Sequence, residues 1–585
     1  MKNLNSHSKF GHVFINALLV LIFAFLSACG SSTPTPPPVE ELPSPMVQPT
    51  AEAIVVPTTA AEATTAPAAT PEANKYGGVL KFGITGDLNS LDGPNCSWLD
   101  WWLAGQGVYD RLYEFDSKSK FVPMLAADYP AVSADGLTYT IKLRQGIKFH
   151  NGREMTAEDV KYSIDRNFAA NVFTCFTGYY GIIEGAKDVL ALPKPPDTVD
   201  LKGTKVVDPY TLEIKLTTPS PSFAFTLATN GTSVVPMQEA KAAGADWAVK
   251  TVIGTGPFKL KEWKAGEKIT LERNPDYWKK GLPYLDGIEV TLNIDAAAAV
   301  LAFENRELDY YQGVSVEDAK RLLGDPKYKD DVRYADVGSQ NYLWLSLIGP
   351  MADVRFRQAI SMAISKDALV QASGGASIVW EQAFSPSMPQ ADPNFKNKWA
   401  YNPDEAAKIV KELYPNGVTV NFWTWGDASS EIMQADLKKV GITMEINQKE
   451  YGVAEPDMKT GLINMRFAGI AYDVLDGTNW GNASSKCDPA DKTRWASEGP
   501  CVDQVNAWID EVNNLALTDP KRTEILRQIQ DFYLNEQVHY IYLKLNRSLD
   551  LAAVYLKDAS TDPIYLFPRL ENAWIDQTLK DQVSK

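Results

Sequence analysis

The first 75 residues restrict the folded part of this chain more than any other feature of its sequence. Two lysines precede an apolar run over residues 13–26, and the tetrapeptide LSAC then ends at Cys29. A charged start, a short apolar stretch and small residues before a cysteine are typical of a secretory signal that ends at a lipidation site. We expect residues 1–28 to be a lipoprotein signal peptide and Cys29 to carry the lipid. The alternative is ordinary cleavage beside an incidental cysteine.

Residues 29–75 predict a lipidated, disordered stalk. They are rich in proline, threonine and alanine and contain almost no aromatic residues. Such a segment cannot bury enough apolar surface to offset the entropy lost on ordering, and its prolines favour extended conformations. We therefore expect a spacer that holds the body away from a membrane, so that the protein works outside the cytoplasm, at the cell surface or in the periplasm. The alternative is an unprocessed pro-segment.

The remaining residues form an acidic body that is too long for one hydrophobic core. The chain is 45% hydrophobic, and its formal net charge is −16. A body of this length predicts two or three lobes. Its negative charge argues against nucleic acid as a partner, because nucleic-acid binding needs a basic surface. The charge also argues against direct contact between the body and anionic lipid.

Four cysteines follow Cys29, and an even number in an exported protein suggests two disulfides. Cys487 and Cys501 flank a short polar loop, which favours a local disulfide. By elimination Cys96 pairs with Cys175, and the alternative for this second pair is two free buried thiols. A metal site is not expected, because the chain contains no Cys-x-x-Cys motif and few histidines.

Strand and helix patterns alternate along the body, which predicts an α/β protein. Residues 138–144 and 211–216 alternate as half-exposed strands do. Residues 354–364 carry apolar side chains at helical spacing. Residues 402–414 predict an amphipathic helix with Asn402 or Asp404 near its N-cap and a proline early in its first turn.

Four longer segments resemble one protein family in their order and spacing. They are residues 77–94, 107–166, 252–278 and 353–370, of which residues 135–159 are the most family-specific part. They resemble the extracellular solute-binding proteins of family 5, which are the peptide, nickel and oligosaccharide receptors of ABC importers. The resemblance covers nearly all of the body.

This resemblance implies a two-lobed, clamshell-like periplasmic-binding-protein fold of type II with one extra domain. Mapped onto this chain, lobe I takes residues 76–98, 250–342 and 541–585. The extra domain takes residues 99–249, and lobe II takes residues 343–540. The chain crosses between the lobes near residues 339–347 and 539–545. The implied partners are a small solute and an ABC permease, with the protein acting as a monomer.

The resemblance also places a ligand contact in the sequence GIAYDVLDGTNW. In the dipeptide- and oligopeptide-binding members, an aspartate followed three residues later by a second acid pairs with the α-ammonium group of the ligand. The matching residues are Asp473 and Asp476. A tryptophan of the family pattern is absent, since Tyr472 precedes the aspartate, and Gly477 replaces the usual proline. The alternative is a solvated aspartate in a turn, or one that caps a helix.

Aromatic side chains supply the remaining candidate walls of the ligand site, since they offer large contact area at low entropic cost. We select Trp98, Trp425 and Tyr472 as ligand-binding candidates, while most of the other tryptophans are expected in cores. The loop between Cys487 and Cys501 resembles the dipeptide-binding type, which favours a short peptide as ligand. An oligosaccharide, bound by stacked tryptophans, is the alternative.

The sequence contains no pattern that predicts catalysis or a cofactor. It lacks a Gly-x-Ser-x-Gly elbow, a His-Glu-x-x-His helix and the Gly-Lys-Ser/Thr ending of a phosphate loop. We therefore expect a binding protein without enzymatic activity, catalytic residues, cofactor or metal. An extracellular carbohydrate-active or peptide-hydrolysing enzyme is the alternative from another class, and a structural adhesin or chaperone-like surface protein is a third.

Overall fold

The computed structural model describes residues 74–583, except for residues 479, 481–486, 488–500, 563, 565 and 566. The expected signal peptide, Cys29 and nearly all of the stalk lie outside the described residues. Within the described part, no helix has both the length and the apolar composition needed to span a membrane.

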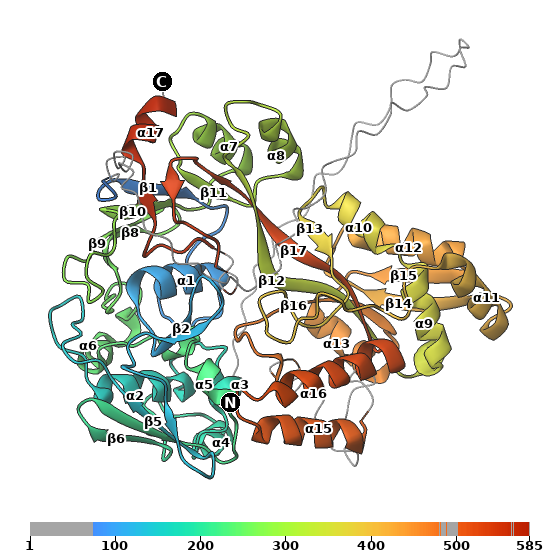
Figure 1. The fold of residues 1–585 in the computed structure, drawn as a ribbon, viewed down its shortest axis with the longest axis horizontal. Helices are drawn as coiled ribbons and strands as arrows, with labels where there is room; N and C mark the ends of the chain where they lie inside the picture. The colour runs from blue at the N-terminus through green and yellow to red at the C-terminus, as the bar shows by residue number, and fades with distance from the viewer. Residues whose placement is uncertain are drawn as a thin grey trace, which may run out of the picture. The chain divides into compact units, whose positions relative to one another are not determined.

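One eleven-stranded mixed sheet runs through the described body, and its two longest strands lie at its centre (Figure 1). These are β12 (Val332–Leu345) and β17 (Tyr540–Ala552), which pair antiparallel along their length. On one side the order continues through β11, β1, β10, β9 and β8, and on the other side through β16, β14 and β15, while β13 pairs with β17. The pairing of β12 with β17 is irregular between Asp336 and Gln340.

The strands beyond β17 pack over a core that is assembled from distant parts of the chain. This core contains buried residues from segments 80–109, 235–328 and 549–575. Its strands are β1 (Val79–Gly83), β8 (Phe258–Lys264), β9 (Lys268–Arg273), β10 (Gly287–Thr291) and β11 (Tyr310–Gln312). The parallel pairing of β1 with β10 and β11 brings residues separated by more than 200 positions into one layer.

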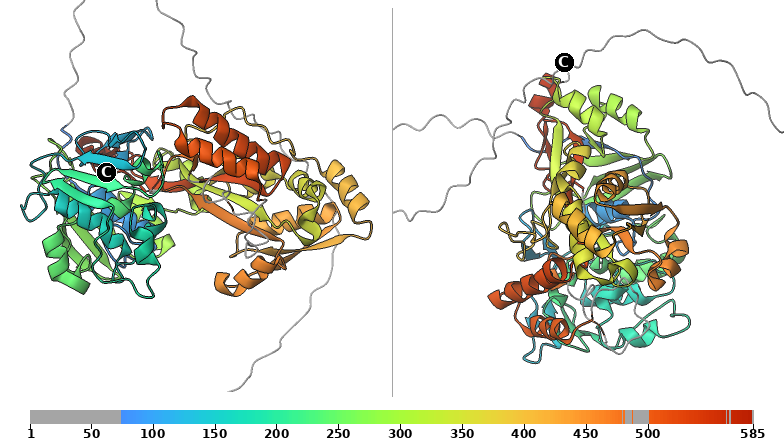
Figure 2. Two further views of the ribbon diagram at one scale, coloured as in Figure 1. Left: turned by 90° about the horizontal axis from the view of Figure 1, so that it is seen from below. Right: turned by 90° about the vertical axis from the view of Figure 1, so that its right-hand side faces the viewer.

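The strands beyond β12 carry helices on both faces. These strands are β14 (Val418–Trp423), β15 (Ile442–Asn447) and β16 (Met465–Ala471), while the short β13 (Ser377–Val379) pairs with β17. One core lies under α9 (Val354–Ala363), α11 (Pro403–Leu413) and α12 (Ser429–Lys439). A second core lies under α15 (Asp503–Asn514) and α16 (Pro520–Asp531), which Figure 2 shows lying together in red-orange.

A separate four-stranded sheet has its own core. It consists of β4 (Ala131–Val132), β5 (Thr138–Lys142), β7 (Thr211–Lys215) and β6 (Thr204–Asp208), with α2 (Ala157–Asp165) packed against it. Alternate residues of β5 and β7 are buried. The two strands expected from alternation near residues 138 and 211 are therefore confirmed.

The apolar pattern from residue 354 onward forms two helices. Helix α9 ends at Ala363, and α10 (Lys366–Ala372) begins after Ser365, whose side chain accepts a hydrogen bond from the amide of Ala368. Serine competes with the backbone for hydrogen bonds and so favours a helix start over a helix interior.

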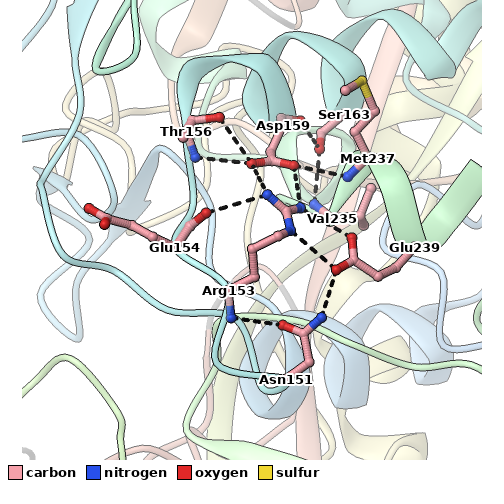
Figure 3. A network of polar contacts seen from close by, with 9 residues as sticks. All are labelled: Asn151, Arg153, Glu154, Thr156, Asp159, Ser163, Val235, Met237 and Glu239. Atoms are coloured by element: carbon pink, nitrogen blue, oxygen red, sulfur yellow. Dashed lines mark hydrogen bonds and ion pairs between the residues drawn. The ribbon is translucent and has the colours of Figure 1, made fainter.

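The most family-specific stretch of the sequence has a structural role (Figure 3). Asp159 in the first turn of α2 accepts hydrogen bonds from the amides of Thr156 and Met237, at 3.0 Å each, and forms an ion pair with Arg153 at 2.6 Å. Arg153 also pairs with Glu239 at 3.1 Å. The capping box and this ion-pair network join the start of α2 to residues 235–239.

The structure contains two disulfides among the described cysteines. They join Cys96 to Cys175 and Cys487 to Cys501. The first bond connects segments that are 79 residues apart in sequence.

We predict that Asp159→Ala destabilises the protein by about 2–4 kcal/mol. The change removes a helix cap and leaves part of the Arg153 charge without its partner. Urea unfolding followed by circular dichroism measures the loss. Glu158→Ala, at the exposed neighbouring position of the same turn, is the matched control and should change stability by less than about 0.5 kcal/mol. Equal effects of the two substitutions would contradict the assignment.

Candidate functional site

Asp473 lies where two parts of the fold meet. It follows β16, and its Oδ2 accepts a hydrogen bond of 2.8 Å from the hydroxyl of Tyr179 in the short helix α3 (Thr177–Tyr180). The two residues are 294 positions apart in sequence. Nearby, Leu475 packs into the core of the four-stranded sheet. The segment after β16 therefore bridges the helix-covered sheet and the separate four-stranded domain.

Burial changes the electrostatics of the Asp473 carboxyl. Asp473 is half-buried, and desolvation raises the pKa of its carboxyl, while the hydrogen bond from Tyr179 acts in the opposite direction. Among the described residues, no lysine, arginine or histidine forms an ion pair with this carboxylate. A partly buried carboxylate in this environment is stabilised by a cation brought to it.

Asp476 lies in the same turn but has a different partner. It is buried, and both of its carboxylate oxygens contact the guanidinium of Arg522 on α16, at 3.1 and 3.3 Å. It also accepts a hydrogen bond of 3.0 Å from the amide of Thr478. The protein itself therefore compensates the charge of Asp476, and the turn is held against α16.

Tyr472, directly before Asp473, is buried. Its hydroxyl donates a hydrogen bond of 2.6 Å to the carbonyl of Ala383, and its ring belongs to the core under α15 and α16. This burial raises the pKa of the Tyr472 hydroxyl. Tyr472 thus lies in the core next to Asp473, where it supports the turn.

Trp425 is the most exposed aromatic residue among those described in the lobe that contains β14. Its side chain is 61% exposed and lies edge-on to Trp423, with ring centroids 5.2 Å apart. Its centroid lies 6.3 Å from that of Phe467 on β16. Trp98 begins helix α1 (Trp98–Leu103), and its side chain lies outside the described residues.

Tyr179 is a site residue that sequence reasoning missed. Its position carries no local signal, since it lies in a four-residue helix and its contact with Asp473 spans 294 positions. The one usable indication is Cys175, four residues earlier, whose disulfide restrains this segment.

Among the described residues, no group of three or more histidine, cysteine, aspartate or glutamate side chains could hold a metal ion.

A family model matches most of the body. Residues 120–492 match the model described as bacterial extracellular solute-binding proteins, family 5 Middle. This range contains β5, the Asp159 network and the segment with Asp473.

Curated relatives extend the match over most of the chain. The glutathione-binding protein GsiB of Pectobacterium atrosepticum is 30% identical over 399 residues, which cover 66% of this chain and 71% of the relative. Heme-binding protein A of Haemophilus influenzae is 26% identical over 401 residues, which cover 64% of this chain and 71% of the relative. These relatives are solute-binding proteins and not enzymes, which confirms the expected class.

Solved structures share the fold. DppA of Helicobacter pylori in complex with the peptide STSA has a TM-score of 0.67 and 23% identity, covering 86% of this chain and 99% of that chain. The unliganded open form of the murein tripeptide-binding protein MppA has a TM-score of 0.71 and 18% identity, covering 86% and 98%. The two-lobed, type II α/β fold expected from the sequence is thereby confirmed.

We predict opposite stability effects for the two aspartates in the unliganded protein. Because the folded state raises the pKa of Asp473 above the ordinary value near 4, its ionisation opposes folding as the pH rises through the folded-state pKa. Asp473→Asn stays neutral, so its stability relative to the wild type should increase from pH 4 to pH 8. Asp476→Ala leaves the buried Arg522 without its charged partner and should cost about 3–5 kcal/mol.

Thermal and urea unfolding across this pH range measure both effects. A pH-independent difference between Asp473→Asn and the wild type would show that Asp473 is not the perturbed group. An Asp476→Ala variant as stable as the wild type would contradict the structural role of the Arg522 pair.

Proposed function

Because the chain belongs to the bacterial extracellular solute-binding proteins of family 5, we propose that it is the receptor of an ABC importer for short peptides. The two lobes close around the peptide, and the closed form is delivered to the permease. Closure is coupled to occupancy because a ligand shifts the conformational equilibrium only by its differential affinity for the closed form. The receptor acts as a monomer.

The carboxylate of Asp473 is the observation that carries this proposal. It is half-buried between two parts of the fold, and a tyrosine hydroxyl is the described group that bonds to it. The α-ammonium group of a peptide would supply the missing positive charge through a charge-assisted hydrogen bond. A ligand without that group would leave the carboxylate desolvated and unpaired, which is the physical basis of selectivity.

The named relatives support a peptide ligand. One structural neighbour holds the peptide STSA, and the relative from Pectobacterium atrosepticum is named for glutathione, which is a tripeptide with a free α-ammonium group. Exposed Trp425 would stack equally well on a sugar, so an oligosaccharide is the second candidate.

The N-terminal sequence supports an anchored form of this receptor. We propose that Cys29 carries the lipid and that the stalk to residue 75 lets the body reach a permease in the same membrane. Acyl chains hold a protein at a membrane without crossing it.

Binding of alanine peptides of two to five residues tests the peptide function. Asp473→Ala should weaken binding of peptides with free termini at least tenfold, because it removes the partner of the α-ammonium group. N-acetylated peptides should bind the wild type weakly and lose little further affinity in the variant. Isothermal titration calorimetry measures both, and Asp503→Ala on α15 is the matched control.

Several outcomes would overturn the peptide function. Equal loss for free and acetylated peptides would remove the ammonium role of Asp473. Wild-type binding of hexose oligomers without any peptide binding would favour the oligosaccharide receptor, and turnover of either ligand would favour an enzyme.

Membrane attachment tests the anchor. Cys29→Ala should move the full-length protein from the membrane fraction to the soluble fraction of the cells that produce it, without changing its affinity for peptides. Metabolic labelling with a palmitate analogue should mark the wild type only. A variant that stays labelled and membrane-bound would contradict lipidation at Cys29.

A further inference from the structure

A buried lysine contacts the start of α12, four residues after Trp425, and has no role in the arrangement described so far. Lys544 is on β17 and is 8% exposed. Its Nζ donates a hydrogen bond of 2.9 Å to the hydroxyl of Ser429. The carboxylate of Asp427 lies 3.9 Å away. Within the described part of the chain, Ser429 is the one acceptor bonded to this ammonium, which has three N–H donors.

The surroundings of Lys544 are unfavourable for a lone cation. Ser429 is the first residue of α12, whose eleven residues direct the positive end of the helix dipole toward the ammonium. The carboxylate of Asp427 offsets this positive potential only in part, because its Oδ1 already accepts a hydrogen bond of 2.7 Å from the amide of Ser429. In the same turn, Ser430 is 3% exposed, and its hydroxyl is without a hydrogen-bond partner among the described residues. The ammonium of Lys544, the positive end of the α12 dipole and the unbonded hydroxyl of Ser430 lie in one place, which favours binding of an anion there.

The sheet register places Lys544 on the same face as the exposed aromatic side chain. Lys544 lies opposite Asn341 on β12, and Asn341 lies opposite Gly469 on β16. Directly opposed residues of antiparallel strands share a face. Two residues before Gly469, Phe467 lies on that face and contacts Trp425. Gly469 is exposed, Asn341 is half-exposed and Lys544 is buried, so the row opens toward β16.

The same row leads to Asp473. Asp473 follows Gly469 by four residues and lies two residues beyond the end of β16, so it is at most about 13 Å from Gly469 along the chain, and Lys544 lies two strands away, or about 10 Å across the sheet. These separations suit the two ends of an extended peptide of about three to five residues.

We infer that Lys544 binds the C-terminal carboxylate of the peptide whose α-ammonium group pairs with Asp473. This inference rests on the proposed function and makes the ligand a short peptide with both termini free. The ammonium of Lys544 would donate its unused N–H groups to the carboxylate, and Trp425 would cover the residues between the termini.

Matched alanine peptides test the inference with the full-length protein. Peptides of two to five residues are titrated with free termini and with a C-terminal amide, against the wild type, Lys544→Met and Lys544→Arg. The wild type should bind the free acids at least tenfold more tightly than the amides. Lys544→Met should abolish this difference by weakening only the acids, and Lys544→Arg should restore part of it.

Control measurements separate binding from folding and from the role of Asp473. Lys439→Met, at the exposed far end of α12, should bind both peptide series as the wild type does. Thermal unfolding establishes that each variant is folded. If Lys544→Met does not fold, the comparison of acids with amides is made with Lys544→Arg. The N-acetylated series reports on Asp473 alone.

The outcomes distinguish the two proposals. If Lys544→Met weakens acids and amides equally, or weakens neither, Lys544 does not bind the carboxylate. The peptide function then still stands, provided that the protein prefers peptides with a free amine to N-acetylated peptides. If affinity differs between acids and amides only when Lys544 is present, but does not differ between free and N-acetylated peptides, the result supports Lys544 and overturns the role of Asp473. Absence of binding to every alanine peptide overturns both.

Discussion

The antiparallel pairing of β12 with β17 is the constraint on which the rest of the structure depends. These two strands carry the central sheet from the β8–β11 side to the β13–β16 side, so the backbone hydrogen bonds between them join both halves (Figure 1). Their register is interrupted between Asp336 and Gln340, next to the row that contains Asn341 and Gly469. The candidate ligand contacts therefore lie beside the part of the ribbon where regular pairing is weakest, which is where a few residues can absorb a change of backbone angle.

The two aspartates of the turn after β16 illustrate how packing separates chemically identical groups. Asp476 is paired with Arg522 and fixes the turn against α16. Asp473, three residues earlier, meets a neutral hydroxyl from the four-stranded domain. Arg522 compensates the charge of Asp476, while no lysine, arginine or histidine among the described residues forms an ion pair with Asp473. Lys544 is the corresponding case of a positive charge, since it lies at the first residue of α12, where the helix dipole favours an anion.

Local patterns in the sequence predicted elements whose stabilising contacts are local. The helix of residues 403–413 begins as expected, with Asn402 accepting a hydrogen bond from the amide of Glu405 and a proline in its first turn. The helical spacing expected over residues 354–364 is likewise confirmed, since α9 runs from Val354 to Ala363 and ends before Ser365. The expected lobe boundaries and ligand residues stay predictions, since they rest on resemblance to a family.

By itself, the sequence determined the α/β class, the alternating strands, the capped helices and the family, because periodicity, turn residues and ordered motifs are properties of neighbouring positions. Only the tertiary structure decided which acid is paired internally, that Tyr179 contacts Asp473, and that Lys544 shares a sheet face with Trp425. Asp476 and Arg522 are 46 positions apart, Lys544 and Ser429 are 115 apart, and Tyr179 and Asp473 are 294 apart. Strand order and register set such contacts, and neither is encoded in any local stretch of the chain.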